Sequence, residues 1–197
     1  MKNPFDTGYY CSDELRDFGF AHVGENVRVA RNCTIMGLEN ISLGDNSRID
    51  ANCTIIALGG PLTLGRYAHV HTSVVLGARG GITLGDFVGI SHGCNLVSAS
   101  DDLSGDWMTN STLPPGCTNP KVAPIYIGDY TAMGVLCTVL PGVNIGTGCA
   151  VYAYSLVKSD LPEWTIAVGL PAKVIRQRSR RLLDKLPDHS SVLSAAA

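Results

Sequence analysis

The stretch LGDNSRIDANCTI, residues 43–55, has aliphatic side chains six residues apart, at Leu43, Ile49 and Ile55. This spacing fits neither the 3.6-residue period of a helix nor the alternation of a single strand. It fits three short strands in each turn of a triangular coil, with each leading aliphatic side chain pointing inward. The Gly and Asn residues that follow Leu43 suit a corner, where the backbone needs positive φ.

The same motif recurs along the chain. The six copies are VGEN (23–26), LGDN (43–46), LGRY (64–67), LGDF (84–87), IGDY (127–130) and IGTG (145–148). Their glycines are 20, 21, 20, 43 and 18 residues apart, so one repeat carries an insertion. One coil cannot bury its own inner face, and about six coils must therefore stack, about 4.8 Å apart, to form a core. The sequence predicts an all-β solenoid, a parallel β-helix with a late inserted loop.

The repeat also defines the parts of the chain. Residues 1–20 are expected to cap the first coil, with a short helix whose N-cap is Ser12. Residues 21–176 form the β-helix, with the inserted loop at 99–124, and residues 177–197 form a basic C-terminal helix and a tail. Long loops in compact domains are commonly functional, so the insertion is a candidate part of a site.

The seven cysteines follow the repeat and form no C-x-x-C pair. Most of them occupy a small, inward position of the coil, where a free thiol behaves as a small hydrophobic side chain. This usage favours structural thiols in a reducing cytoplasm over a metal site. The cysteines at such positions are Cys33, Cys53, Cys94, Cys137 and Cys149.

Charge and hydropathy exclude several classes of partner. A formal net charge of −2 gives no reason to expect a nucleic acid or an anionic membrane surface. No stretch approaches the roughly 18 continuous apolar residues of a membrane span, and no signal peptide is expected.

Two of the five histidines lie two residues apart, at His69 and His71. Val70 between them is an inward position, so both histidines point outward. The stacking of coils places Asp50 one rung from His71, where a carboxylate can orient an imidazole and raise its basicity. Gly89 lies one rung from His69 and leaves space that a ligand can use.

Together the repeat, the late insertion and the closing GLPAKVIR (169–176) resemble the hexapeptide-repeat acetyltransferases, which have a left-handed parallel β-helix. The chain resembles the galactoside, maltose and xenobiotic O-acetyltransferases, and more closely those of surface-polysaccharide (O-antigen) gene clusters. The resemblance covers about residues 18–178. It implies left-handed coils, a homotrimer with active sites between subunits, and acetyl-CoA bound along the later coils as acyl donor, with no metal.

The resemblance also implies a histidine general base, for which there are three candidates. The segment from Gly65 to Val70 is similar to a segment of the sugar-nucleotide N-acetyltransferases of the bacillosamine type, whose histidine lies near the acetyl group. This similarity favours His69. The segment ISHGCNL (90–96) is similar to the one that carries the base in that group, which supports His92, and His71 is the third candidate.

Aspartates are the candidates for binding the acceptor. In the galactoside type a histidine begins the insertion, whereas Asp101 occupies that slot here. Asp101 and Asp102 can bind a hydroxyl or amine or orient a histidine, and Asp50 is grouped with them.

For coenzyme A, the resemblance implies cations and backbone donors on the later coils. Lys173 and Arg176 match basic positions of the family's ending, and Lys158 lies where the family has a basic residue before D-x-P. Gly134 and Ala153 lie where backbone groups can meet pantetheine.

These observations predict an acetyl-CoA-dependent acetyltransferase that acts on a sugar hydroxyl or amine, such as a nucleotide-linked sugar or a surface-polysaccharide precursor. Direct attack in a ternary complex is expected, because no positioned Cys or Ser nucleophile is evident. The alternatives are a zinc lyase like the γ-class carbonic anhydrases, whose H-x-x-x-x-H pair is missing here, and a non-catalytic β-helix scaffold.

Overall fold

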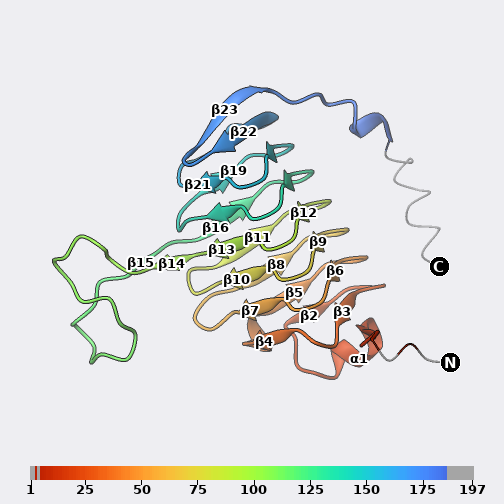
Figure 1. Cartoon of the computed structure of the whole chain (residues 1–197). Helices are drawn as coiled ribbons and strands as arrows, with labels where there is room; N and C mark the ends of the chain where they lie inside the picture. Colours follow the sequence, from red (N-terminus) through yellow and green to blue (C-terminus); the bar gives the residue numbers. More distant parts are fainter. Residues whose placement is uncertain (1–2, 4, 186–197) are drawn as a thin grey trace.

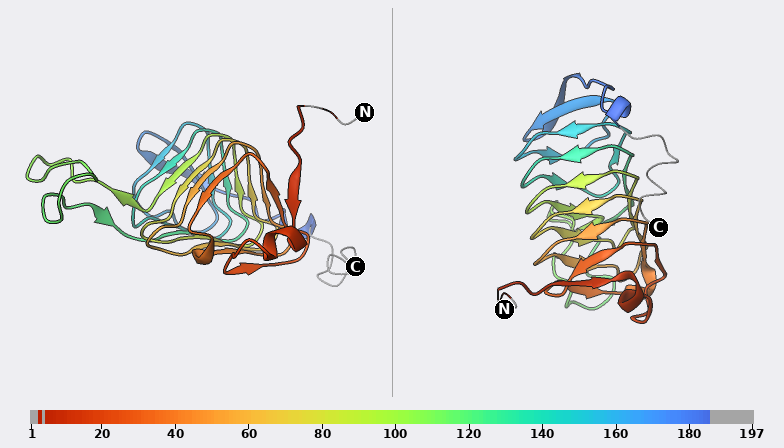
Figure 2. Two further views of the ribbon diagram at one scale, coloured as in Figure 1. Left: turned by 90° about the horizontal axis from the view of Figure 1, so that it is seen from below. Right: turned by 90° about the vertical axis from the view of Figure 1, so that its right-hand side faces the viewer.

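The protein is described by a computed structural model in which residues 3 and 5–185 are placed. Its coils stack into a three-sided prism (Figures 1 and 2). Each face of the prism is one sheet, and consecutive coils pair in parallel, in register, along every face. The predicted solenoid of triangular coils is thus confirmed, and the described residues form six complete coils and the beginning of a seventh.

We call the three faces sheets A, B and C. Sheet B contains β2 (His22–Val23), β5 (Ile41–Leu43), β8 (Leu62–Leu64), β11 (Ile82–Leu84), β16 (Ile125–Ile127) and β19 (Asn144–Ile145). Sheet C contains β4 (Thr34–Met36), β7 (Thr54–Ile56), β10 (Val75–Gly77), β13 (Asn95–Val97), β18 (Thr138–Val139) and β21 (Leu156–Val157).

Sheet A is the longest, because antiparallel strands extend it at both ends. Its strands, in spatial order, are β1 (Tyr9–Cys11), β3 (Arg28–Ala30), β6 (Arg48–Ile49), β9 (His69–Val70), β12 (Gly89–Ile90), β17 (Ala132–Met133), β20 (Ala150–Val151), β22 (Thr165–Gly169) and β23 (Ala172–Gln177). The outermost strands, β1 and β23, therefore cover edges that parallel stacking alone would leave open.

The core is the column of aliphatic side chains that the period of six predicts. In the middle coils these side chains are fully buried, as at Ile49, Val70 and Ile90. Ile35, in the first coil, is half-buried. Full burial of one such side chain stabilises a fold by about 1.5–3 kcal/mol, so the stacked column is the main source of stability.

The corners differ from the prediction in one respect. The glycine of each motif does not have positive φ; the fourth residue does, as in Asn46 (φ 59°) and Tyr67 (φ 57°). The glycine is required by close approach instead, because a Cβ on Gly44 would lie 2.7 Å from the carbonyl carbon of Gly65 in the next coil.

Thiols fill inward positions at the corners of the prism, four of them between sheets A and C and one, Cys149, between sheets B and A. Cys53, Cys94, Cys137 and Cys149 are buried and free, and Cys33 is half-buried. Each Sγ contacts a carbonyl oxygen of the next coil; for Cys53 this is the carbonyl of His71, at 3.0 Å. The thiols thus join neighbouring coils, as expected of structural cysteines.

The N-terminal segment covers the first coil with β1 and α1 (Ser12–Arg16). The helix begins at Ser12 and its N-cap is Cys11, whose N–H donates to Glu14. Ser12, the predicted N-cap, is buried, and its hydroxyl donates to the carbonyl of Gly24 and accepts the N–H of Val27. A further 3₁₀ turn, η1, spans Leu38–Asn40.

After β23 the described chain contains a 3₁₀ turn, η2 (Leu183–Lys185), where the sequence predicts a regular basic helix. One physical reason is the anchoring of Arg178, which donates from one guanidinium nitrogen to the carbonyls of Tyr130, Gly148 and Cys149. Residues 186–197 of the predicted helix and tail lie outside the described residues. Within the described part of the chain, no helix has the length and apolarity needed to cross a membrane.

The insertion leaves the prism between sheets C and B. Its base is an antiparallel pair, β14 (Ala99–Ser100) and β15 (Lys121–Val122), and residues 101–120 project outward (Figure 1). Since the insertion follows β13 of sheet C and precedes β16 of sheet B, it starts at the corner opposite sheet A. This placement determines which site residues one chain can bring together.

Candidate active site

Two rows of outward side chains run along sheet A. One row comes from the residue before the inward aliphatic residue, and the other from the residue after it. Strand register stacks the first row as Arg48, His69, Gly89, Ala132 and Ala150. The second row continues the same ladder, as Asp50, His71, Ser91, Gly134 and Tyr152.

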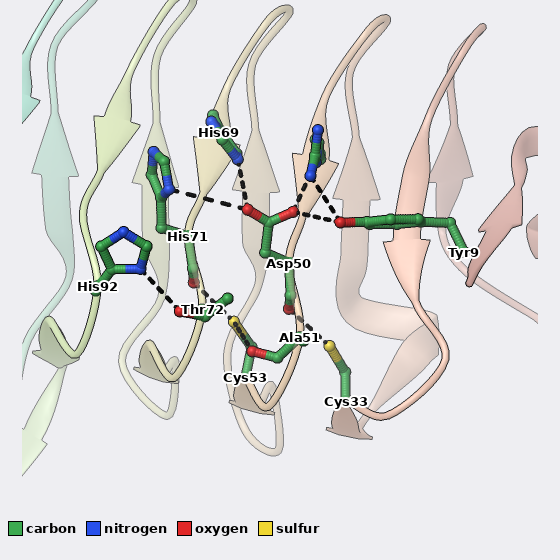
Figure 3. Close-up of polar contacts among 10 residues, drawn as sticks. Tyr9, Cys33, Asp50, Ala51, Cys53, His69, His71, Thr72 and His92 are labelled. Atoms are coloured by element: carbon green, nitrogen blue, oxygen red, sulfur yellow. Dashed lines mark hydrogen bonds and ion pairs between the residues drawn. The ribbon is translucent and has the colours of Figure 1, made fainter. Parts of the chain in front are cut away.

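Asp50 is the centre of a polar cluster at the end of these rows that β6 and β9 form, called the lower end from its position in Figure 1 (Figures 1 and 3). Its Oδ2 lies 2.9 Å from Nε2 of His69. Its Oδ1 accepts hydrogen bonds from Nε of Arg48 at 2.6 Å and from the hydroxyl of Tyr9 at 2.8 Å. Arg48 also donates to the Tyr9 hydroxyl at 2.7 Å. The carboxylate is therefore held on both oxygens, with only 7% of the residue exposed.

Burial and hydrogen bonding act in opposite directions on Asp50. Burial alone raises the pKa of a carboxyl group, whereas the hydrogen bonds from Tyr9, His69 and Arg48 lower it. The net pKa of Asp50 lies below its ordinary value, so the group is ionised at neutral pH. An ionised carboxylate fixed on one ring nitrogen of His69 orients the imidazole and leaves the other nitrogen, Nδ1, to act as a base.

His71 lies beside His69 with a ring-centroid separation of 3.8 Å. Its Nδ1 is 3.9 Å from Asp50 Oδ2, beyond hydrogen-bond distance. The structure thus gives the carboxylate to His69, whereas the sequence placed it next to His71. Burial and then the neighbouring His69 lower the pKa of His71, which favours its neutral form.

His92 joins the cluster from the next coil. Its ring centroid is 4.8 Å from that of His71, and its Nδ1 lies 2.8 Å from the hydroxyl of Thr72 (Figure 3). The three histidines proposed from sequence therefore converge on one patch. Of the three, His69 alone has a carboxylate oxygen within hydrogen-bond distance among the described residues.

Ser91 is a residue to which the sequence gave no role. It follows Ile90 in the second row, between His71 and Gly134, and it is half-buried. Its hydroxyl makes no hydrogen bond with any other described residue, so it is free to donate to a ligand. The column that places Asp50 beside His71 also contains Ser91, and this was the signal available in the sequence.

The upper end of the second row meets some of the predicted coenzyme A residues. A Cβ on Gly134 would lie 2.5 Å from the backbone N of Ala153, so these two backbones are in close contact. Arg176 of β23 reaches the row as well, with its guanidinium 3.4 Å from the hydroxyl of Tyr152. Gly134, Ala153 and Arg176 are thus neighbours along one track.

The other two predicted cations lie elsewhere on the last coils. Lys173 is exposed on β23, opposite Val168. Lys158 is exposed and directly follows β21, a strand of sheet C. The described contacts do not join Lys158 to the track on sheet A.

Asp101 and Asp102 are in the inserted loop, at the corner opposite sheet A. Asp102 accepts the N–H of Ser104 at 2.8 Å and lies 3.4 Å from the amide of Asn119. The hydrogen bonds from Ser104 lower the pKa of the Asp102 carboxyl group. In the described part of the chain, neither aspartate contacts the histidine cluster.

Similarity searches relate this arrangement to known enzymes. No protein-family model matches the sequence. The chain is 35% identical over 176 residues, 89% of its length and 92% of the relative's, to dTDP-4-amino-4,6-dideoxy-D-glucose acyltransferase of Escherichia coli. It is also 38% identical to WbbJ of Escherichia coli, described as a lipopolysaccharide biosynthesis O-acetyl transferase, over 72 residues, 36% of this chain and 37% of WbbJ.

Among solved structures, AntD, an N-acyltransferase from Bacillus cereus, superposes on the chain with a TM-score of 0.87. The sequence identity is 32%, and the match covers 97% of this chain and all of AntD. Repeat, fold and full-length similarity agree. The chain therefore belongs to the hexapeptide-repeat acyltransferases, the enzymes with a left-handed β-helix.

Proposed function

We propose that the protein transfers an acetyl group from acetyl-CoA to the amino group of a nucleotide-linked 4-amino-4,6-dideoxy sugar, with His69 as general base. The observation that carries the proposal is the Asp50–His69 pair at the end of a row that leads to the coenzyme A candidates. The Escherichia coli relative is named for such a sugar, and a serine variant of AntD has been solved with dTDP-4-amino-4,6-dideoxyglucose and coenzyme A.

The reaction balances with residues of this chain. The sugar amine attacks the thioester carbonyl, a C–N bond forms, and His69 Nδ1 accepts the proton that the nitrogen loses. In this proposal the Ser91 hydroxyl donates to the oxyanion that develops on the carbonyl oxygen. Collapse breaks the C–S bond, and the proton passes from His69 to the departing sulfur.

The length of the second row of sheet A supports an orientation in which acetyl-CoA lies along that row. From His71 to Tyr152 there are three strand spacings of about 4.8 Å, or about 14 Å. Acetyl-CoA would lie along this track with its thioester beside Ser91 and its phosphates near Arg176. The small residues at Gly134 and Ala153 leave the track smooth, and phosphates need a cation such as Arg176.

A second line of support concerns Asp101. Solved AntD structures include variants at one serine and at one aspartate, ten positions apart in that chain. Ser91 and Asp101 have the same spacing here. Asp101 lies at the base of the insertion, at the corner opposite sheet A, and so away from the histidines of its own chain. We therefore propose a homotrimer in which the insertion of one subunit reaches the histidines of the next. There Asp101 and Asp102 bind the sugar.

The proposal also places the protein in the cytoplasm, where thiols such as the buried cysteines stay reduced. The deciding experiment incubates the purified protein with acetyl-CoA and dTDP-4-amino-4,6-dideoxyglucose. We expect released thiol and a product heavier by one acetyl group that is stable to mild base, as an amide is. Hydroxyl acetylation, which the partial similarity to WbbJ favours, would give a base-labile ester. Absence of turnover with amino and hydroxy sugar nucleotides would contradict both.

A further inference from the structure

We propose that Asp50, His69 and His71 form a binding site for a divalent transition-metal ion such as Zn²⁺, and that this ion inhibits acyl transfer. The binding stands on the geometry of the three side chains alone. Only the inhibition rests on the proposed function, in which His69 is the base. The ion is thus an inhibitor that competes for the base and its carboxylate, with no part in the reaction.

The spacing of the three groups fits an ion between them. Each offers one ligand atom, and these atoms all lie within 4.8 Å of one another. The Asp50 oxygen is 2.9 Å from the His69 nitrogen and 3.9 Å from the His71 nitrogen. Ligands about 2.0–2.1 Å from a tetrahedral zinc are roughly 3.3 Å apart, so modest side-chain rotations complete the site.

The ligand types select the class of metal. Two imidazoles and one carboxylate suit Zn²⁺, Co²⁺, Ni²⁺ or Cu²⁺, whereas Mg²⁺ and Ca²⁺ prefer all-oxygen sets. About a third of each histidine side chain is exposed, which leaves a path for an ion and room for a water or a fourth ligand. In Figure 3 the two rings lie on the same side of the Asp50 carboxylate.

The surroundings hold the carboxylate as the outer shell of a metal site does. Tyr9 and Arg48 occupy Oδ1, so Oδ2 stays directed at the two imidazoles. Hydrogen-bonded support of a ligating carboxylate orients it for the metal. The positive charge of Arg48 opposes a cation at this distance, and the site is therefore expected to be reversible and weaker than a four-ligand structural site.

Occupancy would prevent general-base catalysis. An ion bound to His69 Nε2 and Asp50 Oδ2 separates the ring from the carboxylate that orients it. With Nε2 bound to the ion, the neutral imidazole carries its remaining proton on Nδ1, so Nδ1 has no lone pair with which to accept the proton of the amine. We therefore expect added Zn²⁺ to abolish most acyl transfer and a chelator to restore it.

The test titrates the full chain, without substrates, with Co²⁺ and Zn²⁺. Co²⁺ should give the visible absorption bands of a low-symmetry site, Zn²⁺ should displace it, and calorimetry should show about one ion per chain. His71→Ala should weaken binding at least tenfold. His92→Ala is the matched control, since this histidine neighbours the site but is held by Thr72, and it should leave the affinity within about twofold. Circular dichroism checks that both variants fold.

Three results would overturn the proposal. The first is the absence of stoichiometric ion binding by the wild-type chain. The second is equal affinity of wild type and His71→Ala for the ion. Such a result would mean that the ion binds at other groups, such as the exposed Cys11 thiol, and not at the proposed site. The third is full transfer activity with zinc bound, which removes the inhibitory role. Failure of the proposed function looks different: no sugar is acetylated, while the Co²⁺ bands and their dependence on His71 remain.

Discussion

The two ends of the outer surface of sheet A are chemically opposite, although the same coil builds both. The lower end, on β6 and β9, carries Arg48, Asp50 and the two histidines of β9 in one hydrogen-bonded cluster. The upper end, on β12, β17 and β20, carries no charged side chain in either row: the first row has Gly89, Ala132 and Ala150, and the second has Ser91, Gly134 and Tyr152. On the inner side the two ends are alike, since every strand contributes one buried aliphatic residue or methionine.

This contrast shows how the repeat separates stability from chemistry. Inward positions are constrained by packing, because a coil must match the coils above and below it. Outward positions carry no such requirement, so they can hold a charged cluster in one coil and a smooth track in the next. The proposed base beside the proposed donor track is the arrangement that acyl transfer in a ternary complex needs.

Removing His69 should produce the largest effect, because it takes the proposed general base from the polar end. His69→Ala should lower turnover by about 10²–10⁴-fold, the usual contribution of a general base. The side chain is one-third exposed, so the melting temperature should change by no more than about 2 °C. Thiol release and thermal unfolding measure the two. His22→Ala, an exposed histidine on sheet B, is the control, and a loss of less than tenfold for His69→Ala would exclude His69 as the base.

Two glycines at the upper end of sheet A should respond differently to substitution, because Gly134 is needed for packing and Gly89 faces the proposed ligand. Gly134→Ala should destabilise the fold by about 1–3 kcal/mol, since its Cβ would lie 2.5 Å from the backbone of Ala153. Gly89→Ala should leave unfolding unchanged, because nothing lies within 4 Å of its Cβ position. Urea unfolding of both variants tests this, and equal stabilities would show that the track is not closely packed. Gly89→Leu should additionally raise a substrate KM.

Removing the Tyr9 hydroxyl should weaken the polar end without dismantling it. Tyr9→Phe deletes one hydrogen bond to Asp50, so turnover should fall about tenfold. The pH–rate profile should also shift, because the carboxylate that orients His69 loses a donor. Tyr10→Phe is the matched control, since this neighbour packs against Phe18 in the N-terminal segment, after α1. An unchanged profile in Tyr9→Phe would show that Tyr9 is structural only.

The smallest expected effect is the acid sensitivity of the polar end. The folded pKa of Asp50 lies below its ordinary value of 3.8, so its ionised form stabilises the fold above that value. This stabilisation is lost as the pH falls through the folded pKa. Asp50→Asn should therefore be less stable than wild type at pH 7, by about 1 kcal/mol, and the gap should close toward acid pH. A gap that is constant from neutral to acid pH would contradict this.

Much of this contrast follows from the sequence. The period of six identifies the inward residues, among them Val70. Because neighbouring side chains of a strand point to opposite faces, His69 and His71 on either side of Val70 must both point outward. The motif spacings also locate the insertion. These predictions succeed because a coil repeats one local geometry, in which each position has a fixed direction relative to the next coil.

Other features depend on contacts between distant segments. Tyr9 reaches Asp50, 41 residues away, because β1 pairs antiparallel with β3, and no repeat predicts that pairing. The local composition after β23 favours a helix. In the structure Arg178 instead hydrogen-bonds to three carbonyl groups of earlier coils, a contact that no local pattern predicts.

The sequence by itself determined the stacked coils, the buried column and the outward histidine pair, because each follows from local periodicity. Only the tertiary structure decided that the carboxylate of Asp50 bonds to His69 in place of His71. The physical reason is that side chains in adjacent rows can reach across one another, and the hydrogen bonds from Tyr9 and Arg48 fix which oxygen of Asp50 faces which ring.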